Sequence, residues 1–322
     1  MMLKKWVFFI FSFIQIIWLA GCTEKSFEPI DRHQSFVASL NIQEPSLDFI
    51  DAQGNVTASW TFDKAYTGAL LLDKDRILLY GNQLDEIDVY TLSTGKKLYS
   101  KKVKLGTTNV YFAPDAKQFF ITNSKMNTVT SFDVEGNELA QQRLGNYPMS
   151  MAAYKEKLYV VNYKDTKLSI LSIKDLTVEQ EWPIEKSSHG MVIIEETNEL
   201  WIGGHGEGSK PNSSVKRFNL KTGAVLGEIE MPLMPVGLTK TKDKVLVVSH
   251  GQNELYVVDF NGKVKWHKEV GANPFVVNQF KDYIVVAGYD DHTLYFIKEG
   301  QIQNSVDVGK GAFQLLVREE EK

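Results

Sequence analysis

Seven short apolar runs recur along this chain, and each ends at a small or amide residue. The seven marker residues are Asn41, Gly81, Asn123, Asn162, Gly204, Ser249 and Gly288. Successive markers are separated by 39 to 45 residues. A repeat of about 40 residues that carries only strand-like segments is typical of a β-propeller, in which each repeat forms one four-stranded blade. The markers therefore predict an all-β fold with seven blades.

The repeats also align beyond the markers. Six residues after six of the markers, the next strand carries an apolar residue that is expected to point inward: Leu47, Ile87, Val129, Leu168, Leu255 and Leu294. The fifth repeat differs, because Val215 follows Gly204 only after eleven residues. The segment 205–214 therefore contains a five-residue insertion. A loop present in one blade only favours a functional role, since loops carry function more often than the scaffold does.

The two ends of the repeat region are incomplete in complementary ways. Phe36 to Asn41 has the pattern of a second strand, with no first strand before it. Residues 309–317 have the pattern of an innermost strand, with no further strand after it. We therefore expect the C-terminal strand to join the first blade as its innermost strand. Such closure leaves no open sheet edge in the ring.

Some repeats resemble a known family. The segment Leu158-Tyr159-Val160-Val161-Asn162, followed by Leu168-Ser169-Ile170-Leu171-Ser172, resembles the YVTN-type repeat of surface-layer and periplasmic propellers. Residues 145–148 and 271–274 match the Gly-x-x-Pro segment of that family. The resemblance covers about residues 36 to 318 and implies a seven-bladed propeller. Four markers are not the Asn of the repeat, and the family includes adhesive, ligand-binding and dehydrogenase-like proteins, so the resemblance specifies no single function.

The N-terminus has the layout of a secretory signal. Lys4 and Lys5 precede an apolar stretch from Trp6 to Leu19, and small residues follow it. As a helix this stretch would be about 21 Å long, shorter than the ~30 Å hydrocarbon core of a bilayer. It therefore predicts a cleaved signal peptide rather than a permanent membrane span.

The residues Leu19-Ala20-Gly21-Cys22 resemble the bacterial lipobox. The resemblance implies that Cys22 carries a diacyl (palmitate-type) lipid and becomes the first residue of the mature protein. Cys22 is the only cysteine in the sequence, so it has no disulfide partner within the chain; a free thiol is the alternative. We expect a signal peptide over 1–21, a lipidated tether over 22–35 and the propeller over 36–322. The expected location is extracytoplasmic, anchored to the cell membrane.

Charge excludes one class of partner. The formal net charge is −4 and becomes more negative when Lys4 and Lys5 are removed with the signal. Nucleic-acid binding requires clustered Lys and Arg side chains that replace phosphate counterions. The sequence contains no such cluster, so nucleic acid is not an expected partner, and a monomer is the expected state.

The candidate site lies where the second strand of each blade ends. The residues after the markers should form one ring around the central channel, which we call the rim: Ile42, Asn82, Ser124, Tyr163, His205, His250 and Tyr289. The last four are aromatic or imidazole side chains on consecutive blades. His189 precedes the first strand of the fifth blade and should point to the same rim, and Glu207 lies two residues after His205.

Two classes of function fit this rim. The favoured hypothesis is a binding scaffold without a fixed cofactor, whose ligand is a small molecule or an envelope protein. The alternative is a propeller enzyme, a lactonase or lyase assisted by a divalent metal ion held by His189, His205 and His250. A structural role also remains open, in which the rim side chains cap hydrogen bonds between blades or face water. No catalytic residue is assigned.

Overall fold

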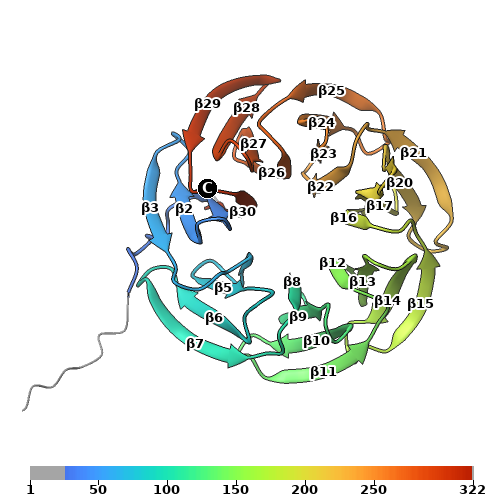
Figure 1. Ribbon diagram of the computed structural model, residues 1–322, viewed down its shortest axis with the longest axis horizontal. Helices are drawn as coiled ribbons and strands as arrows, with labels where there is room; N and C mark the ends of the chain where they lie inside the picture. Colours follow the sequence, from blue (N-terminus) through green and yellow to red (C-terminus); the bar gives the residue numbers. More distant parts are fainter. Residues whose placement is uncertain (1–25, 321–322) are drawn as a thin grey trace, which may run out of the picture.

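The computed structural model describes residues 26–320. These residues form seven four-stranded antiparallel sheets arranged as a ring around a central axis (Figure 1). The first blade contains β30 (Ala312–Arg318), β1 (Phe36–Asn41), β2 (Ser46–Ile50) and β3 (Val56–Thr61), and the second contains β4 (Gly68–Leu71), β5 (Arg76–Tyr80), β6 (Glu86–Thr91) and β7 (Lys96–Lys102). The expected seven-bladed propeller is therefore confirmed.

The other five blades follow in chain order, each numbered from the innermost strand outward. Blade three contains β8 (Thr107–Ala113), β9 (Gln118–Asn123), β10 (Thr128–Asp133) and β11 (Glu138–Arg143). Blade four contains β12 (Pro148–Tyr154), β13 (Lys157–Asn162), β14 (Lys167–Ser172) and β15 (Val178–Pro183). Blade five contains β16 (Ser188–Ile194), β17 (Glu199–Gly204), β20 (Ser214–Asn219) and β21 (Val225–Glu230), with the hairpin β18 (Gly206–Glu207) and β19 (Lys210–Pro211) inserted. Blade six contains β22 (Pro235–Lys240), β23 (Val245–Ser249), β24 (Glu254–Val258) and β25 (Val264–Glu269). Blade seven contains β26 (Pro274–Phe280), β27 (Tyr283–Gly288), β28 (Thr293–Lys298) and β29 (Gln301–Asp307).

The core of the ring lies between neighbouring blades. Each of the seven hydrophobic clusters formed by the described residues joins side chains of two adjacent blades. The second strands are buried on both faces, which explains why their sequences read as uninterrupted apolar runs. The outer strands instead alternate; β7, for example, exposes every second side chain.

The marker residues are explained by the loops that close over the ends of the second strands. Where the marker is polar, its side chain bonds a neighbouring segment: Asn123 Nδ2 donates to the carbonyls of Lys104 and Leu105 in a loop, and Asn162 Nδ2 donates to that of Lys167 at the start of β14. Where the marker is Gly204, a Cβ atom would meet the backbone of Ser187 and Ser188. Small or amide residues recur because this position has either no room or a required hydrogen bond.

The C-terminal strand closes the ring as expected. β30 pairs antiparallel with β1 from Phe36–Arg318 to Asn41–Ala312. Ala312, Leu315 and Leu316 are buried on this strand. The sheet order β3-β2-β1-β30 thus places the last strand of the chain at the centre of the first blade.

Packing against the blades begins at Phe27, within the segment expected to be a tether. The Phe27 ring stacks on Trp60 with ring centroids 4.9 Å apart, and its backbone N–H donates to the carbonyl of Gly95. Ile30 is buried between the first two blades. Cys22 and the expected signal peptide lie outside the described residues. Among residues 26–320 there is no helix with the length and apolar character needed to cross a membrane.

Candidate functional site

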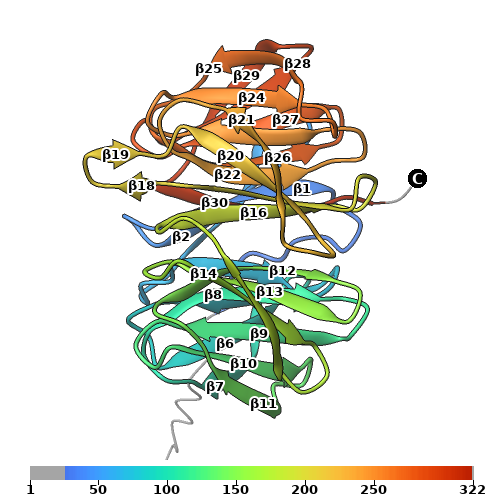
Figure 2. The same cartoon turned by 90° about the vertical axis from the view of Figure 1, so that its right-hand side faces the viewer.

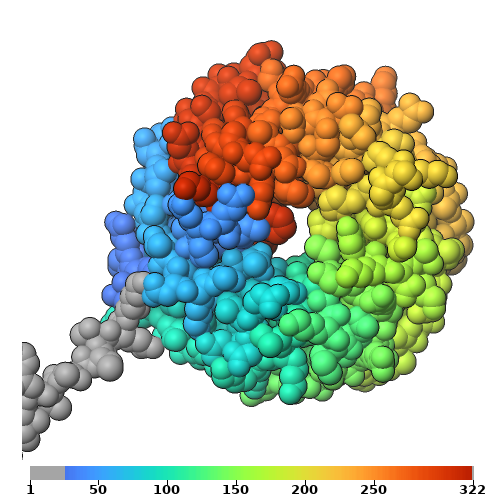
Figure 3. All heavy atoms as spheres, in the orientation of Figure 1, coloured from blue at the N-terminus to red at the C-terminus, as the bar shows by residue number. Residues whose placement is uncertain are grey.

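The rim lies at one end of the central channel, where the loops after the second strands meet the loops that lead into the innermost strands. Figure 3 shows that the ring is hollowed at its centre. Within a blade, the rim residue is fixed by a hydrogen bond from its backbone N–H to the loop before the innermost strand. Tyr163 donates to the carbonyl of Tyr147 at 2.9 Å, His205 to that of Ser187 at 3.0 Å, and His250 to that of Met234 at 3.2 Å.

The innermost strands of several blades are irregular at their first residues. The pairing register shifts between Pro148 and Met151, between Ser188 and Met191, and between Pro274 and Val276. Such bulges re-aim the side chains they contain. The second residues of two of these strands, His189 and Phe275, lie within the irregular segments and join the rim. This local geometry explains how side chains of innermost strands reach a ring formed mainly by loop residues.

The aromatic and imidazole rings of this region form one continuous band, which we call the aromatic arc. Its members are Tyr147, Tyr163, His189, His205, His250, Phe275, Tyr289 and Phe313. Successive rings contact along the arc with centroids 4.8 to 6.5 Å apart. The arc extends from blade four through blade seven to β30. All eight side chains are half-buried, as expected for residues that line an opening.

The three expected histidines are neighbours within the arc. The ring centroids of His189 and His205 are 5.6 Å apart, and those of His205 and His250 are 5.1 Å apart. Tyr163 contacts the edge of His205 with centroids 6.0 Å apart. Tyr289 lies further along the arc and reaches His250 through Phe275. The structure therefore brings five of the six expected site residues into one connected band.

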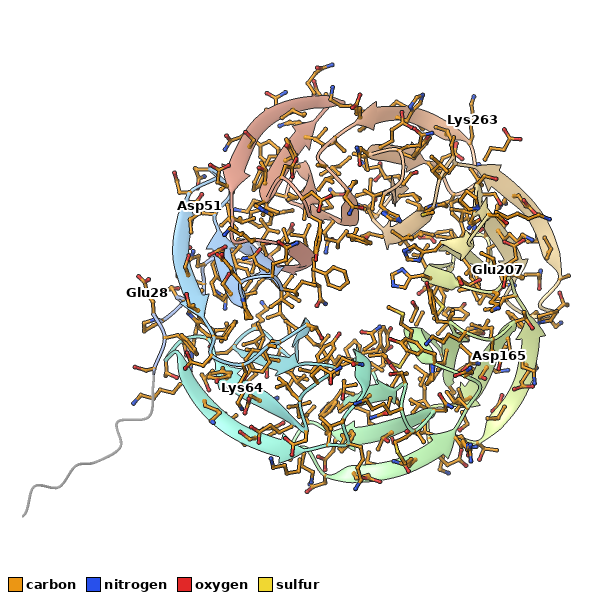
Figure 4. All side chains as sticks on the ribbon, viewed as in Figure 1. Glu28, Asp51, Lys64, Asp165, Glu207 and Lys263 are labelled. Carbon is orange, nitrogen blue, oxygen red and sulfur yellow. The ribbon has the colours of Figure 1, made fainter. Side chains whose placement is uncertain are left out.

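Glu207, the sixth expected site residue, has a different environment. It lies on β18 and pairs with Lys210 of β19 in the inserted hairpin. Its carboxylate forms an ion pair with Lys186 Nζ at 2.8 Å and is largely exposed. Figure 2 shows the hairpin projecting beyond the end of the ring, and in Figure 4 the label of Glu207 lies over blade five, away from the central opening. The insertion thus forms a hairpin that projects from the ring beside His205.

Burial keeps two of the histidines neutral at physiological pH. Desolvation, followed by the nearby His205 and His250 imidazoles, lowers the pKa of His189 to about 4. Desolvation, followed by His250, lowers the pKa of His205 to about 4 as well. An imidazole of ordinary pKa would be partly charged near pH 6.5. This part of the arc is therefore uncharged over the physiological range.

The hydrogen bonds of the three imidazoles differ. The His189 ring bonds the backbone of Val236, while its Nδ1 is buried without a partner. The Nδ1 of His205 is also buried without a partner. His250 is engaged at both nitrogens: Nδ1 lies 2.6 Å from Asn273 Oδ1, and Nε2 lies 3.1 Å from Met234 Sδ. Two imidazole nitrogens of the arc are thus buried without a hydrogen-bond partner.

Among residues 26–320, no three His, Cys, Asp or Glu side chains are grouped to hold a metal ion. The expected set of three histidines with Glu207 is therefore not assembled as a divalent metal centre in this part of the chain. The physical reason for Glu207 is its pairing with Lys186 on the hairpin. The histidines instead contact one another as members of a chain of rings.

Five residues of the site escaped the sequence analysis: Tyr147, Met234, Asn273, Phe275 and Phe313. Tyr147, Met234 and Asn273 precede the prolines that begin three innermost strands and have positive φ angles of 62°, 68° and 54°. This conformation is uncommon for residues other than glycine. Tyr147 and Asn273 lie in the two Gly-x-x-Pro segments visible in the sequence, and Met234 precedes Pro235 at the corresponding position, so the residue before each of these prolines is the signal that could have located all three.

Another hollow of the surface lies between blades three and four. It encloses about 750 Å³ and is lined by residues that include Tyr111, Gln118 and Lys155. Its lining includes both acidic side chains, those of Asp115, Glu156 and Glu179, and basic ones, and Glu179 also pairs with Lys157 at 3.3 Å. Its charges are therefore matched locally, and it lacks the connected rings that distinguish the arc.

The chain was compared with known proteins by sequence and by structure. No protein-family model matches it, and no curated protein matches it in sequence. Several solved structures share its fold. One is a functionally unknown protein from Desulfotomaculum acetoxidans, with a TM-score of 0.74 and 9% identity over 89% of this chain and 99% of that one.

Two further structures have named functions of their own. Hydrazine synthase from Kuenenia stuttgartiensis matches with a TM-score of 0.73 and 13% identity over 89% of this chain and 99% of that one. Virginiamycin B lyase from Staphylococcus aureus matches with a TM-score of 0.62 and 14% identity over 76% of this chain and 84% of that one. At these identities the comparisons show the propeller fold alone, and function has to be argued from the site.

Proposed function

We propose that this protein is a lipid-anchored, extracytoplasmic binding protein of the YVTN-type propeller family, and that its ligand or partner docks on the aromatic arc. The observation that carries the proposal is the continuity of the arc, in which eight half-buried rings contact one another over four blades and β30. Aromatic side chains offer large contact areas with polar edges, and they are enriched at binding surfaces.

The arc also defines the kind of ligand. His189 and His205 are neutral because burial lowers the pKa of each to about 4, and tyrosine and phenylalanine carry no charge at neutral pH. Tyr163, Phe275 and Tyr289 offer ring faces and edges beside them. The arc is therefore suited to an uncharged ligand surface that combines apolar groups with a few hydrogen-bond donors.

The arc favours binding over metal-assisted hydrolysis by a divalent ion. Hydrolysis of that kind needs a metal set and a group that activates water. The carboxylate expected to contribute, Glu207, is held by Lys186 on the hairpin. The hairpin itself fits a binding role, because it projects from the ring directly after His205, whose carbonyl accepts a hydrogen bond from the N–H of Asn212 at 2.9 Å.

Membrane attachment rests on the sequence: the basic start, the apolar stretch and the lipobox-like residues that end at Cys22. Two acyl chains give stable anchoring, whereas one gives reversible binding. The expected result is incorporation of labelled palmitate into the wild-type protein and none into a Cys22→Ala variant, with the variant released from the membrane fraction. Equal incorporation in both proteins would contradict the proposed anchor.

Docking on the arc is tested by site-specific photocross-linking in cells. A benzoylphenylalanine at Tyr289 should yield an adduct, because this side chain lies in the arc. The same residue at Lys263, in the turn between β24 and β25 at the other end of blade six, is the matched control and should yield none. A second substitution, Tyr163→Ala, should reduce the adduct at Tyr289 several-fold. Equal adducts at both positions, or no adduct at Tyr289, would overturn docking on the arc without affecting the palmitate result.

A further inference from the structure

One contact between the aromatic arc and a neighbouring loop residue brings two electron-pair donors together. His250 Nε2 lies 3.1 Å from the thioether sulfur of Met234. The other ring nitrogen, Nδ1, lies 2.6 Å from Asn273 Oδ1. An amide oxygen only accepts hydrogen bonds, so in the neutral imidazole this contact places the proton on Nδ1 and leaves the lone pair on Nε2. The lone pair of Nε2 therefore faces a sulfur atom that is itself only a weak acceptor.

This arrangement of His250 matches that of a metal-binding imidazole. A histidine ligand typically donates its second ring N–H to an oxygen of a neighbouring residue, which fixes the tautomer and the ring orientation. Asn273 supplies that oxygen, and its own backbone N–H donates to Asn253 Oδ1 at 2.8 Å. Nε2 is thereby presented to the space shared with Met234.

A second imidazole lies at the right separation. Two imidazoles that bind one ion with N–metal distances of about 2.0 Å, at tetrahedral to trigonal angles, have ring centroids roughly 5 to 5.5 Å apart. The centroids of His205 and His250 are 5.1 Å apart, and the rings are inclined by 70°. His205 also has a buried Nδ1 without a hydrogen-bond partner.

The backbone around Met234 is held in an unusual conformation. Leu233 and Met234 both have positive φ angles, of 54° and 68°. Residues with large side chains rarely adopt this conformation, and it persists only where the surrounding structure holds it. Their carbonyls accept hydrogen bonds from the N–H groups of Gly251 and His250, which keep the segment in place beside the His250 ring. The loop thus holds the thioether against the imidazole.

We propose that Met234, His205 and His250 form a binding site for a soft monovalent metal ion, Cu(I). Thioether and imidazole are the ligands that soft copper ions accept, whereas Zn²⁺ favours thiolate, imidazole and carboxylate. Because two imidazoles and a thioether carry no negative charge, the set suits a monovalent ion better than a divalent one. The inference adds to the proposed function: the ion would bind where His205, His250 and Met234 meet, and the neighbouring rings of the arc would remain the docking surface for the uncharged ligand.

The test uses the full-length protein purified from membranes and freed of metal. Under anaerobic conditions it is titrated with Cu(I) in competition with the chromophoric Cu(I) chelator bicinchoninate. We expect one Cu(I) per chain, an affinity reduced at least about tenfold in Met234→Leu, and loss of binding in His250→Phe. A parallel titration with Zn²⁺ should show weaker binding and no effect of Met234→Leu, because the thioether contributes little to binding of that ion.

The matched control is Met126→Leu, whose side chain is exposed in the turn between β9 and β10 of blade three and belongs neither to the arc nor to the proposed metal site. It should bind Cu(I) like the wild type. Thermal unfolding of the metal-free variants shows whether Met234→Leu remains folded. An affinity for Cu(I) equal in wild type and Met234→Leu, or no uptake by the wild type, would overturn the site. Persistence of the Tyr289 cross-link in metal-free protein would then leave the proposed docking function standing by itself.

Discussion

A chain that ends at Val308 is expected not to form a stable propeller. Truncation there removes β30, the innermost strand of blade one, with the buried side chains of Ala312, Leu315 and Leu316. It also exposes the whole pairing edge of β1. The loss exceeds what a fold with a net stability of about 5–15 kcal/mol can tolerate. Unfolding followed by tryptophan fluorescence should lose its cooperative transition.

The matched control is a chain that ends at Glu320, which keeps β30 and removes only the last two residues. It should unfold like the full chain. Addition of a synthetic peptide covering residues 309–320 should restore part of the transition to the truncated protein. A cooperative transition of unchanged midpoint in the chain that ends at Val308 would show that β30 does not close the ring.

The second large effect is expected from Asp88→Ala in blade two. The Asp88 carboxylate is fully buried and accepts hydrogen bonds from Lys64, Tyr66 and Ser100. Removal of one partner of a buried, hydrogen-bonded ion pair leaves the other groups unsatisfied and typically costs about 3–5 kcal/mol. Denaturant titration should show that loss at pH 7. The control is Asp85→Ala, whose exposed carboxylate pairs with Lys102 at 3.2 Å and should contribute less than about 1 kcal/mol.

The contribution of Asp88 to the free energy of unfolding should decrease as the pH falls. Burial alone would raise the pKa of this carboxyl, but the hydrogen bonds from Lys64, Ser100 and Tyr66 outweigh burial and lower the pKa below 3.8. A carboxyl with a lowered pKa in the folded state stabilises the fold above its unfolded pKa, and this contribution is lost as the pH falls through the folded value. The difference between wild type and Asp88→Ala should therefore be constant near pH 7 and shrink below about pH 4. A difference that grows on acidification would contradict this assignment.

Most of the architecture could be predicted from the repeat. The markers and the apolar residues after them, such as Leu47 and Leu168, are buried where expected, because a strand covered on both faces has to be apolar throughout. The closure of the first blade was also predictable, since each end of the repeat region had the strand pattern that the other lacked. The packing of Phe27 against the blades was not predictable. Its ring contacts Trp60 through a single side chain that lies outside the repeats, so no repeated pattern indicates the contact.

The candidate site was predictable only in part. His205 and His250 were located because they follow markers, and the fold brings equivalent positions of neighbouring blades together. Met234 and Asn273 were missed because their contribution depends on a left-handed backbone before proline, which no periodic pattern reports. Glu207 was placed with the histidines because it is close to His205 in sequence, but the hairpin turns its carboxylate to Lys186.

Arg318, at the end of β30, connects the C-terminal strand to the segment that precedes β1. Its guanidinium is buried, donates to the backbone carbonyls of Asp31, Gln34 and Lys74, and lies over the Phe36 ring. A pull on the chain before Phe27 is therefore resisted first by the packing of Phe27 and Ile30 and then by Arg318. The contacts of Phe27 and Ile30 lie outside the β1–β30 ladder, whereas Arg318 pairs with Phe36 at the end of that ladder, so Phe27 and Ile30 can yield before the ladder is loaded. The segment from Phe27 to Ile30 thus takes up tension before the strand pairing that closes the ring does.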